Sequence, residues 1–269
     1  SIAQNKYKSY KDIKKIPNGI NIIHDNDKTT AIVGIHGFYP VYWVKIHHEW
    51  VQPFNWLINQ DIKTFFYKYN WNECPSKVLE DFSIELKKLI AENPNVNNWQ
   101  IVGHSMGSLV ALDFAARYPR HTRSLALLGT STPMPVSDVL LDAAKNDDRA
   151  AMVMANTWSH SAPGLMGGHK SPGMTLYFGG LRLLQRTPEG VYFADLAACN
   201  AFEAGPVRAE AVTCPTLVVL GNEDKMTGPK QSRAVASSIQ GARVVELDCG
   251  HAMLSEQSNA VLAALKTIV

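Results

Sequence analysis

The sequence predicts an α/β fold in which a mostly parallel sheet is flanked by helices and carries an inserted group of helices. Short apolar runs that read as strands alternate with longer stretches whose apolar residues recur at helical spacing. The run at 215–221 is apolar throughout, which is typical of a parallel strand buried on both faces. The interval between Leu128 and Pro215 is too long for a simple crossover, so it predicts an insertion.

Segments rich in Val, Ile, Phe or Leu between turn residues are predicted as strands: 19–24, 30–35, 62–69, 99–102, 122–129, 215–221 and 242–248. Segments with helical periodicity are predicted as helices: 45–59, 76–92, 108–118, 136–158, 191–203 and 253–269. The helix at 76–92 has a clear start, because Ser76 opens it and Glu80 and Asp81 lie in its first turns. We interpret the apolar positions of these helices as core contacts.

Residues 103–107 read Gly-His-Ser-Met-Gly, a G-x-S-x-G motif between the strand at 99–102 and the helix at 108–118. Its glycines let the backbone fold back sharply, which places the Ser105 hydroxyl above the sheet and beside the start of the following helix. This context predicts that Ser105 is a nucleophile. The alternative is a turn of small residues selected only for packing.

A serine nucleophile needs a base and an acid, and both follow later strands. His251 comes after the strand-like run 242–247 and opens the last helix, and Asp224 comes directly after the apolar run 215–221. Two other acids compete with Asp224. Glu223 is one residue away and would point elsewhere, and Asp248 is better explained as a loop cap because three residues is a poor distance for orienting His251.

The serine turn, Asp224 and His251, each after its own strand, resemble the α/β-hydrolase superfamily, and in particular its serine esterases and lipases with a helical cap. The resemblance implies a triad of Ser105, Asp224 and His251. It also implies that the long interval holds the cap, with a core at 1–134 and 206–269 and a cap at 135–205.

The resemblance further implies two backbone donors for the oxyanion. One is the N–H of Met106, and the other is the N–H of Phe38, which follows His36 and Gly37 in a His-Gly-x loop after the strand at 30–35. His36 is interpreted as a residue that hydrogen-bonds this loop. Supporting roles are also expected for the remaining residues of the serine turn, Gly103, His104 and Gly107.

Two segments bear on the substrate. Residues 159–174 are rich in Gly, Ser and Pro, which favours a lid hinge over a plain surface loop. Aromatic residues near the expected oxyanion loop suggest an apolar pocket, although core packing explains them nearly as well: Phe38, Tyr39, Tyr42 and Trp43.

The composition excludes several function classes. With 26 Lys and Arg against 24 Asp and Glu, the net charge of +2 gives no reason to expect a nucleic-acid partner. No apolar run approaches the roughly 20 residues that cross a bilayer. The first 15 residues are polar and Lys-rich, so no signal peptide is visible, and we expect a cytoplasmic protein with free thiols.

The sequence contains no pattern that binds a metal or a cofactor. His47 and His48 are adjacent, so on the predicted helix they point to different faces and have the wrong spacing for one ion. No H-E-x-x-H, zinc-finger cysteine pair, phosphate-binding loop or dinucleotide motif is present. We therefore predict that the protein needs neither a cofactor nor a metal.

The composition changes abruptly near residue 100. Residues 1–100 contain 12 Lys, 13 Ile, 3 Ala and no Arg, whereas residues 101–269 contain 5 Lys, 3 Ile, 24 Ala and 9 Arg. An Ala-rich cap does not explain the missing arginine, but the codon usage of a low-GC and a high-GC source does. We therefore hypothesise that the chain is a chimera of two family members, joined near the serine turn.

These observations together predict a carboxylic ester hydrolase that acts on a small, apolar ester through an acyl-enzyme. The same three residues would also serve a cofactor-free perhydrolase or haloperoxidase, or a C–C bond hydrolase. The alternative from another class is a ligand-binding protein that keeps the fold without turnover.

The choice between the acids is testable by substitution. Asp224→Asn is expected to lower the turnover of an ester by orders of magnitude while the protein stays folded, because the imidazole loses the group that orients it. The turnover of a 4-nitrophenyl ester and the circular dichroism of the variant provide the check. If Asp248→Asn has this effect and Asp224→Asn does not, the assignment of the acid is wrong.

Overall fold

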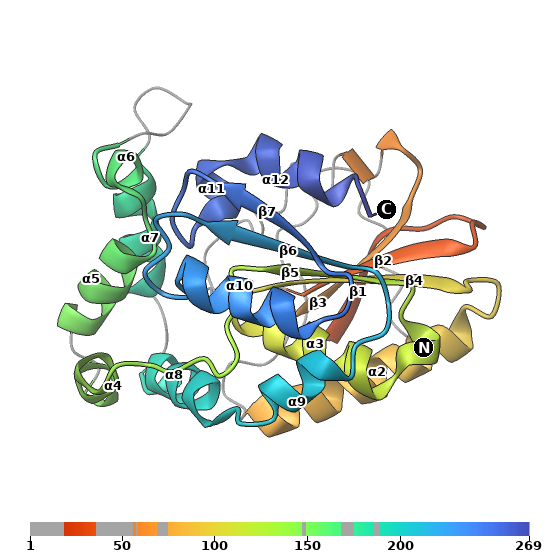
Figure 1. Cartoon of the computed structure of the whole chain (residues 1–269), viewed down its shortest axis with the longest axis horizontal. Coiled ribbons are helices and arrows are strands. Elements are labelled where there is room, and N and C mark those ends of the chain that lie inside the picture. Colours follow the sequence, from red (N-terminus) through yellow and green to blue (C-terminus); the bar gives the residue numbers. More distant parts are fainter. Residues whose placement is uncertain are drawn as a thin grey trace.

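A computed structural model describes residues 19–35, 56–57, 59–68, 75–146, 149–167, 175–185 and 189–268. Within these ranges the chain forms one sheet in the order β1-β3-β2-β4-β5-β6-β7, drawn in Figure 1. Its strands are β1 (Gly19–His24), β2 (Thr30–Ile35), β3 (Lys63–Lys68), β4 (Asn98–His104), β5 (Ser124–Leu128), β6 (Thr216–Gly221) and β7 (Arg243–Leu247). β1 pairs antiparallel with β3 and the other pairings are parallel, which confirms the predicted mostly parallel sheet.

Both faces of the sheet are covered by helices. One face carries α2 (Pro75–Glu92), α3 (Met106–Arg117) and α10 (Pro229–Ser238), and the other carries α11 (Met253–Glu256) and α12 (Ser258–Leu265) (Figure 1). In the central strands β2, β4, β5 and β6, side chains alternate between the two resulting cores. In β5, Leu125 and Leu127 pack towards α3, whereas Ala126 and Leu128 pack on the side of α11 and α12.

The predicted helix at 253–269 is wrong as a single element, because α11 and α12 are separate helices. Gln257 between them has φ −130° and ψ 41°, which is not helical, and its side-chain amide donates to the carbonyl of Asp248 at 3.3 Å. The segment predicted as helical at 136–158 is likewise divided, into α4 (Asp138–Lys145) and α5 (Arg149–Trp158). Most of the helix predicted at 45–59 lies outside the described residues.

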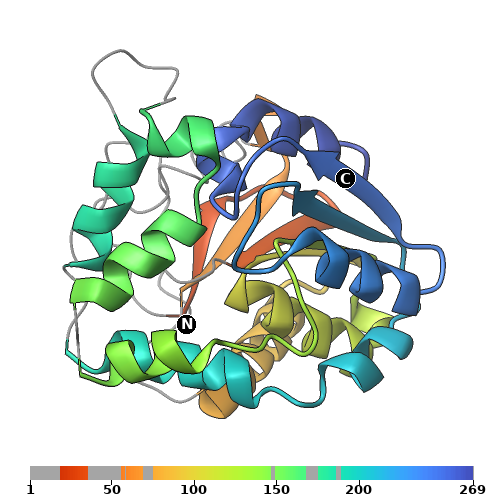
Figure 2. The same cartoon turned by 60° about the vertical axis from the view of Figure 1, so that its left-hand side comes forward.

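The chain between β5 and β6 carries a separate layer of helices. This helical layer consists of α4, α5, α6 (Ala162–Leu165), α7 (Leu176–Leu184) and α8 (Val191–Ala201). Its buried residues form an apolar cluster of their own, built on Leu140, Ala144, Ala151, Ala155, Tyr192 and Leu196. Figures 1 and 2 show the layer beyond the carboxyl ends of the parallel strands, where it faces the serine turn.

A buried aspartate, Asp113, connects α3 of the core to the segment that follows the helical layer. After α8 the short helix α9 (Gly205–Glu210) packs on α3. Arg208 of α9 donates through Nε to Asp113 Oδ1 of α3 at 2.7 Å, and Arg117 donates to the other carboxylate oxygen at 3.2 Å. The short 3-10 turn η2 (Pro119–His121) leads from α3 to β5.

Across the described ranges, no helix is both long and apolar enough to cross a bilayer.

Removal of the buried aspartate tests this connection. Asp113→Ala is expected to lower the free energy of unfolding by about 2 kcal/mol, because two charge-assisted hydrogen bonds are lost next to the core. The midpoint of urea denaturation measures the effect. The matched control is Glu246→Ala, which removes an exposed pair with Arg233 and is expected to leave the midpoint unchanged. Equal shifts for the two variants would contradict this role of Asp113.

Candidate active site

The turn between β4 and α3 holds Ser105 in a strained conformation. Its φ is 53° and its ψ is −127°, a region that residues other than glycine rarely adopt and that costs about 1–3 kcal/mol. The Ser105 N–H donates to the carbonyl of Leu128 at 2.9 Å, and the Ser105 carbonyl accepts from the Ser108 hydroxyl at 2.6 Å. These bonds to β5 and α3 hold the backbone of Ser105 in place.

Gly103, the first glycine of the motif, lets the strand and the helix approach closely. A Cβ atom on Gly103 would lie 2.2 Å from the carbonyl oxygen of Gly107, which is far inside van der Waals contact. Any larger residue at position 103 would therefore push α3 away from β4. The sequence pattern Gly-x-Ser-x-Gly thus follows from the sharpness of the turn.

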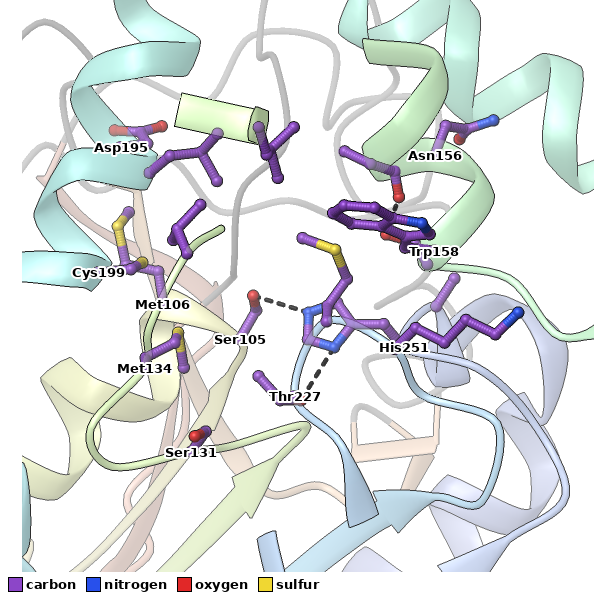
Figure 3. Close-up of a pocket in the computed structure, with 18 of the residues that line it drawn as sticks. Ser105, Met106, Ser131, Met134, Asn156, Trp158, Asp195, Cys199, Thr227 and His251 are labelled. Carbon is purple, nitrogen blue, oxygen red and sulfur yellow. Dashed lines mark hydrogen bonds between the residues drawn. The ribbon is translucent and has the colours of Figure 1, made fainter. Parts of the chain in front are cut away.

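Ser105, His251 and Asp224 come together in a chain of hydrogen bonds. His251 Nε2 lies 2.8 Å from Ser105 Oγ, and His251 Nδ1 lies 2.8 Å from Asp224 Oδ2. Figure 3 shows the imidazole between the serine and the loop that carries Thr227. The structure therefore brings together the three residues that the sequence predicts as a triad, from the ends of β4, β6 and β7.

The carboxylate of Asp224 is buried and fully hydrogen-bonded. Its Oδ1 accepts from the N–H groups of Met226 and Thr227, both at 2.8 Å, and its Oδ2 accepts from the Thr227 hydroxyl at 2.8 Å. Burial alone raises the pKa of Asp224, but the charge of His251 and the hydrogen bonds from His251 and Thr227 outweigh burial and hold it below its ordinary value. The stability that this carboxylate contributes is therefore present at neutral pH and is lost as the pH falls below its ordinary range near 3.8.

The two competing acids have other partners. Glu223 accepts through Oε2 from the N–H of Ala162 at 2.9 Å, and Asp248 accepts through Oδ1 from Asn222 at 3.0 Å. In the described part of the chain, neither makes a hydrogen bond to His251. The geometry favours Asp224 as the partner of the imidazole.

His104, the variable residue of the serine turn, also supports the His251 loop. Its ring is buried, and its Nε2 lies 3.0 Å from the backbone carbonyl of His251. The two imidazole centroids are 5.0 Å apart. His104 therefore connects the turn after β4 to the loop after β7.

Gly129 is a site residue that the sequence analysis missed. It follows β5 with φ 52°, and a Cβ at this position would lie 3.1 Å from both Cε1 and Nδ1 of His251. Because glycine has no Cβ atom, the imidazole ring of His251 can lie against the backbone of Gly129. A Gly directly after a buried strand was the available signal in the sequence.

Glu256 is a second residue that the sequence analysis missed. Its carboxylate accepts from the Ser161 N–H at 3.2 Å, from the Ser161 hydroxyl and from the Gly250 N–H at 3.3 Å. The Ala252 N–H also donates to the Ser159 carbonyl at 2.8 Å. The turn 159–162 of the helical layer is thus bonded to the loop that carries His251. A lid hinge in 159–174 stays a prediction, and residues 168–174 lie outside the described residues.

Of the two residues predicted as oxyanion donors, the structure describes Met106. Met106 is the first residue of α3, so its N–H is one of those that find no acceptor within the helix. Met106 and Ser105 line the same cavity. Phe38, His36 and Gly37 lie outside the described residues, as do the aromatic residues Tyr39, Tyr42 and Trp43 and the pair His47 and His48.

A cavity of about 440 Å³ lies between the sheet and the helical layer. Its core side includes His104, Ser105, Met106, Ser131, Met134, Thr227 and His251. Its helical-layer side includes Leu140, Asn156, Trp158, His160, Leu184, Tyr192, Asp195, Leu196 and Cys199 (Figure 3). The walls are mainly apolar, and Ser105 opens directly into this space. Across the described ranges, His, Cys, Asp and Glu side chains form no group of three able to hold a metal ion.

The family of the chain follows from a comparison of its sequence with family models. Residues 33–265 match the model of the alpha/beta hydrolase family. The chain belongs to this family. No curated protein matches the sequence significantly.

Solved structures share the fold at low sequence identity. The enol-lactonase from Burkholderia xenovorans LB400 has a TM-score of 0.74 at 18% identity, over 93% of this chain and 95% of that chain. A thermophilic esterase from Thermogutta terrifontis has a TM-score of 0.70 at 19% identity, over 93% and 91%. A bromoperoxidase from Bacillus anthracis has a TM-score of 0.73 at 14% identity, over 95% and 97%.

The contact between Gly129 and His251 is testable with an alanine. Gly129→Ala is expected to lower ester turnover at least tenfold, because the added methyl group displaces the imidazole by tenths of an ångström. The assay is the kcat for a 4-nitrophenyl ester, with a urea denaturation curve to measure the strain of about 1 kcal/mol.

The matched control is Gly241→Ala. Gly241 has φ 74° and open space around its Cβ position, so this variant carries the same backbone strain without a contact at the site. Its turnover is expected to equal that of the unaltered protein. Equal losses of activity in the two variants would show that strain, and not the contact with His251, is responsible.

Proposed function

We propose that the protein is a serine hydrolase that cleaves carboxylic esters through an acyl-enzyme. The observation that carries the proposal is the hydrogen-bonded chain from Ser105 Oγ through His251 to Asp224, with both bonds at 2.8 Å. Ser105, at one end of this chain, lines a cavity large enough for a small organic substrate. Membership of the alpha/beta hydrolase family agrees with this chemistry.

In the first half of the proposed reaction, Ser105 Oγ attacks the ester carbonyl carbon while its proton passes to His251 Nε2. Asp224 accepts from Nδ1–H, so it fixes the tautomer in which Nε2 is free to take the proton, and it stabilises the imidazolium that forms. His251 then returns the proton to the leaving alcohol. The acyl group remains bonded to Ser105.

In the second half, water attacks the acyl-enzyme by the same route and releases the acid. The negative oxygen of each tetrahedral intermediate accepts from the Met106 N–H at the start of α3, and we assign the second donor to Phe38. Loss of one such donor typically costs a hundredfold to a thousandfold in rate. No metal or cofactor takes part in these steps.

The helical layer serves in this proposal as the cap predicted at 135–205. Trp158, Leu184 and Leu196 contribute apolar walls to the cavity from this layer. These side chains support an apolar acyl or alcohol group in the substrate, because such a group gains from leaving water.

A second reaction uses the same side chains. Perhydrolysis replaces water by hydrogen peroxide in the attack on the acyl-enzyme. The likeness to a structure named as a bromoperoxidase is the observation that favours testing it.

The proposal is tested with an active-site probe and a series of substrates. A fluorophosphonate is expected to label Ser105, and 4-nitrophenyl esters of increasing acyl length are expected to turn over with a graded preference. Mass spectrometry locates the label and absorbance follows nitrophenolate release. Peroxide added to the assay measures peracid formation in competition with hydrolysis.

Two variants make the test specific. Ser105→Ala is expected to abolish both labelling and turnover, whereas Ser237→Ala, which changes an exposed serine of α10, is expected to keep the label on Ser105. A protein that binds esters but shows neither labelling nor turnover would contradict the proposal and favour a ligand-binding role.

A further inference from the structure

Asp195 is the buried carboxyl group that the proposed reaction leaves unused. It lies on α8 of the helical layer and is 4% exposed. It lines the same cavity as Ser105 and His251, and Figure 3 shows it on the opposite side of that cavity. Among the described residues that line the cavity, it is the one with a carboxyl side chain.

Asp195 belongs to a row of α8 side chains that line the cavity. Tyr192, Asp195, Leu196 and Cys199 follow the spacing i, i+3, i+4 and i+7, and all four line the cavity. A helix stripe that faces a cavity is usually apolar. The carboxyl group therefore interrupts an otherwise favourable apolar wall.

Comparison with the other buried aspartates shows what Asp195 lacks. Asp113, Asp195 and Asp224 are 4%, 4% and 3% exposed. Asp113 accepts from two arginines, and Asp224 accepts from His251 and Thr227. By contrast, the shielded Oδ2 atom of Asp195 has no hydrogen-bond partner within the described part of the chain.

Burial without a partner favours the neutral form of the Asp195 carboxyl group. Burial raises its pKa well above the ordinary value, and no neighbouring positive charge in the described residues opposes this. Burial also raises the pKa of Cys199, to about 12. A neutral carboxyl offers one O–H donor together with an acceptor oxygen. Because the terminal torsion of aspartate is soft and two-fold, either oxygen can turn to the cavity.

We propose that Asp195 determines substrate specificity, and that the acyl part of the substrate carries a hydroxyl or amide group that hydrogen-bonds its carboxyl group. This rests on the proposed function, because the ester itself has to reach Ser105. Hydroxyl and amide groups each combine a donor with an acceptor, so they complement a neutral carboxyl group. Unpartnered buried polar groups call for a ligand or another explanation, and a site on the cavity wall supplies the ligand. The substrate class is therefore an apolar ester or lactone with one polar group in its acyl chain.

The test compares matched ligands. Methyl acetamidoalkanoates, with two to five methylenes between the ester and the amide, are each paired with the methyl alkanoate of equal chain length. Binding to Ser105→Ala is measured by calorimetry, and hydrolysis by the unaltered active site is measured by titration of released acid. One member of the acetamido series is expected to bind and react about tenfold better than its alkyl partner.

Three variants distinguish recognition from a structural role. Asp195→Leu is expected to lose the amide preference and to raise the melting temperature, because a buried polar group without a partner is removed. Asp195→Asn keeps a donor and an acceptor and is expected to retain most of the preference. The control Phe193→Leu, on the same helix but not among the residues that line the cavity, is expected to leave the ratio unchanged.

The outcomes separate this inference from the proposed function. If the amide preference in binding is present but no ester is hydrolysed, the proposed function fails and the role of Asp195 stands. If esters are hydrolysed and Asp195→Leu leaves the amide-to-alkyl ratio unchanged, the role of Asp195 is wrong. A lower melting temperature of Asp195→Leu with an unchanged ratio would assign Asp195 to the packing of the layer.

Discussion

The hydrogen bonds on the two nitrogens of His251 are the interaction on which the rest of the site depends. They join Ser105 after β4 to Asp224 after β6, at 2.8 Å on each side, so the ring cannot rotate without breaking one of them. Gly129 after β5 makes room for the ring, because a Cβ atom at this position would lie 3.1 Å from it. This arrangement is possible because neighbouring parallel strands end at one edge of the sheet, and their pairing fixes the distances between the loops.

The sheet and the helical layer contribute different parts of the site. The sheet positions the three side chains of the proposed triad. Ser105 and Asp224 follow β4 and β6, which are buried and hydrogen-bonded to two neighbouring strands, and His251 follows β7, which pairs with β6 at the edge of the described sheet. The helical layer supplies the opposite wall, where apolar side chains surround Asp195. Substitutions in the layer therefore alter which molecules fit, whereas substitutions in the loops alter whether the reacting atoms meet.

The sequence was sufficient to locate the strands and the serine turn, because apolar runs and the glycines at 103 and 107 report local constraints. Gly129 and Glu256 were missed because their importance comes from distant partners, although the position of Gly129 directly after a buried strand was a signal. Glu256 contacts a residue 95 positions earlier in the chain. The break at Gln257 was missed for another reason, since glutamine is an ordinary helix former. The change in composition falls within β4, which pairs with β2 on one side and β5 on the other.

The bonds of the turn 159–162 limit how molecules reach and leave the cavity. This turn is tied to Glu223 in the acid loop and to Ala252 beside the base. If the layer lifted at this edge, the movement would pull on both loops and separate Asp224 and His251, to which the proposed proton transfer is assigned. If this edge served as the entrance, each opening would interrupt the proposed proton transfer. Substrate and product that enter and leave without disturbing the proposed triad therefore have to pass along the other edges of the helical layer.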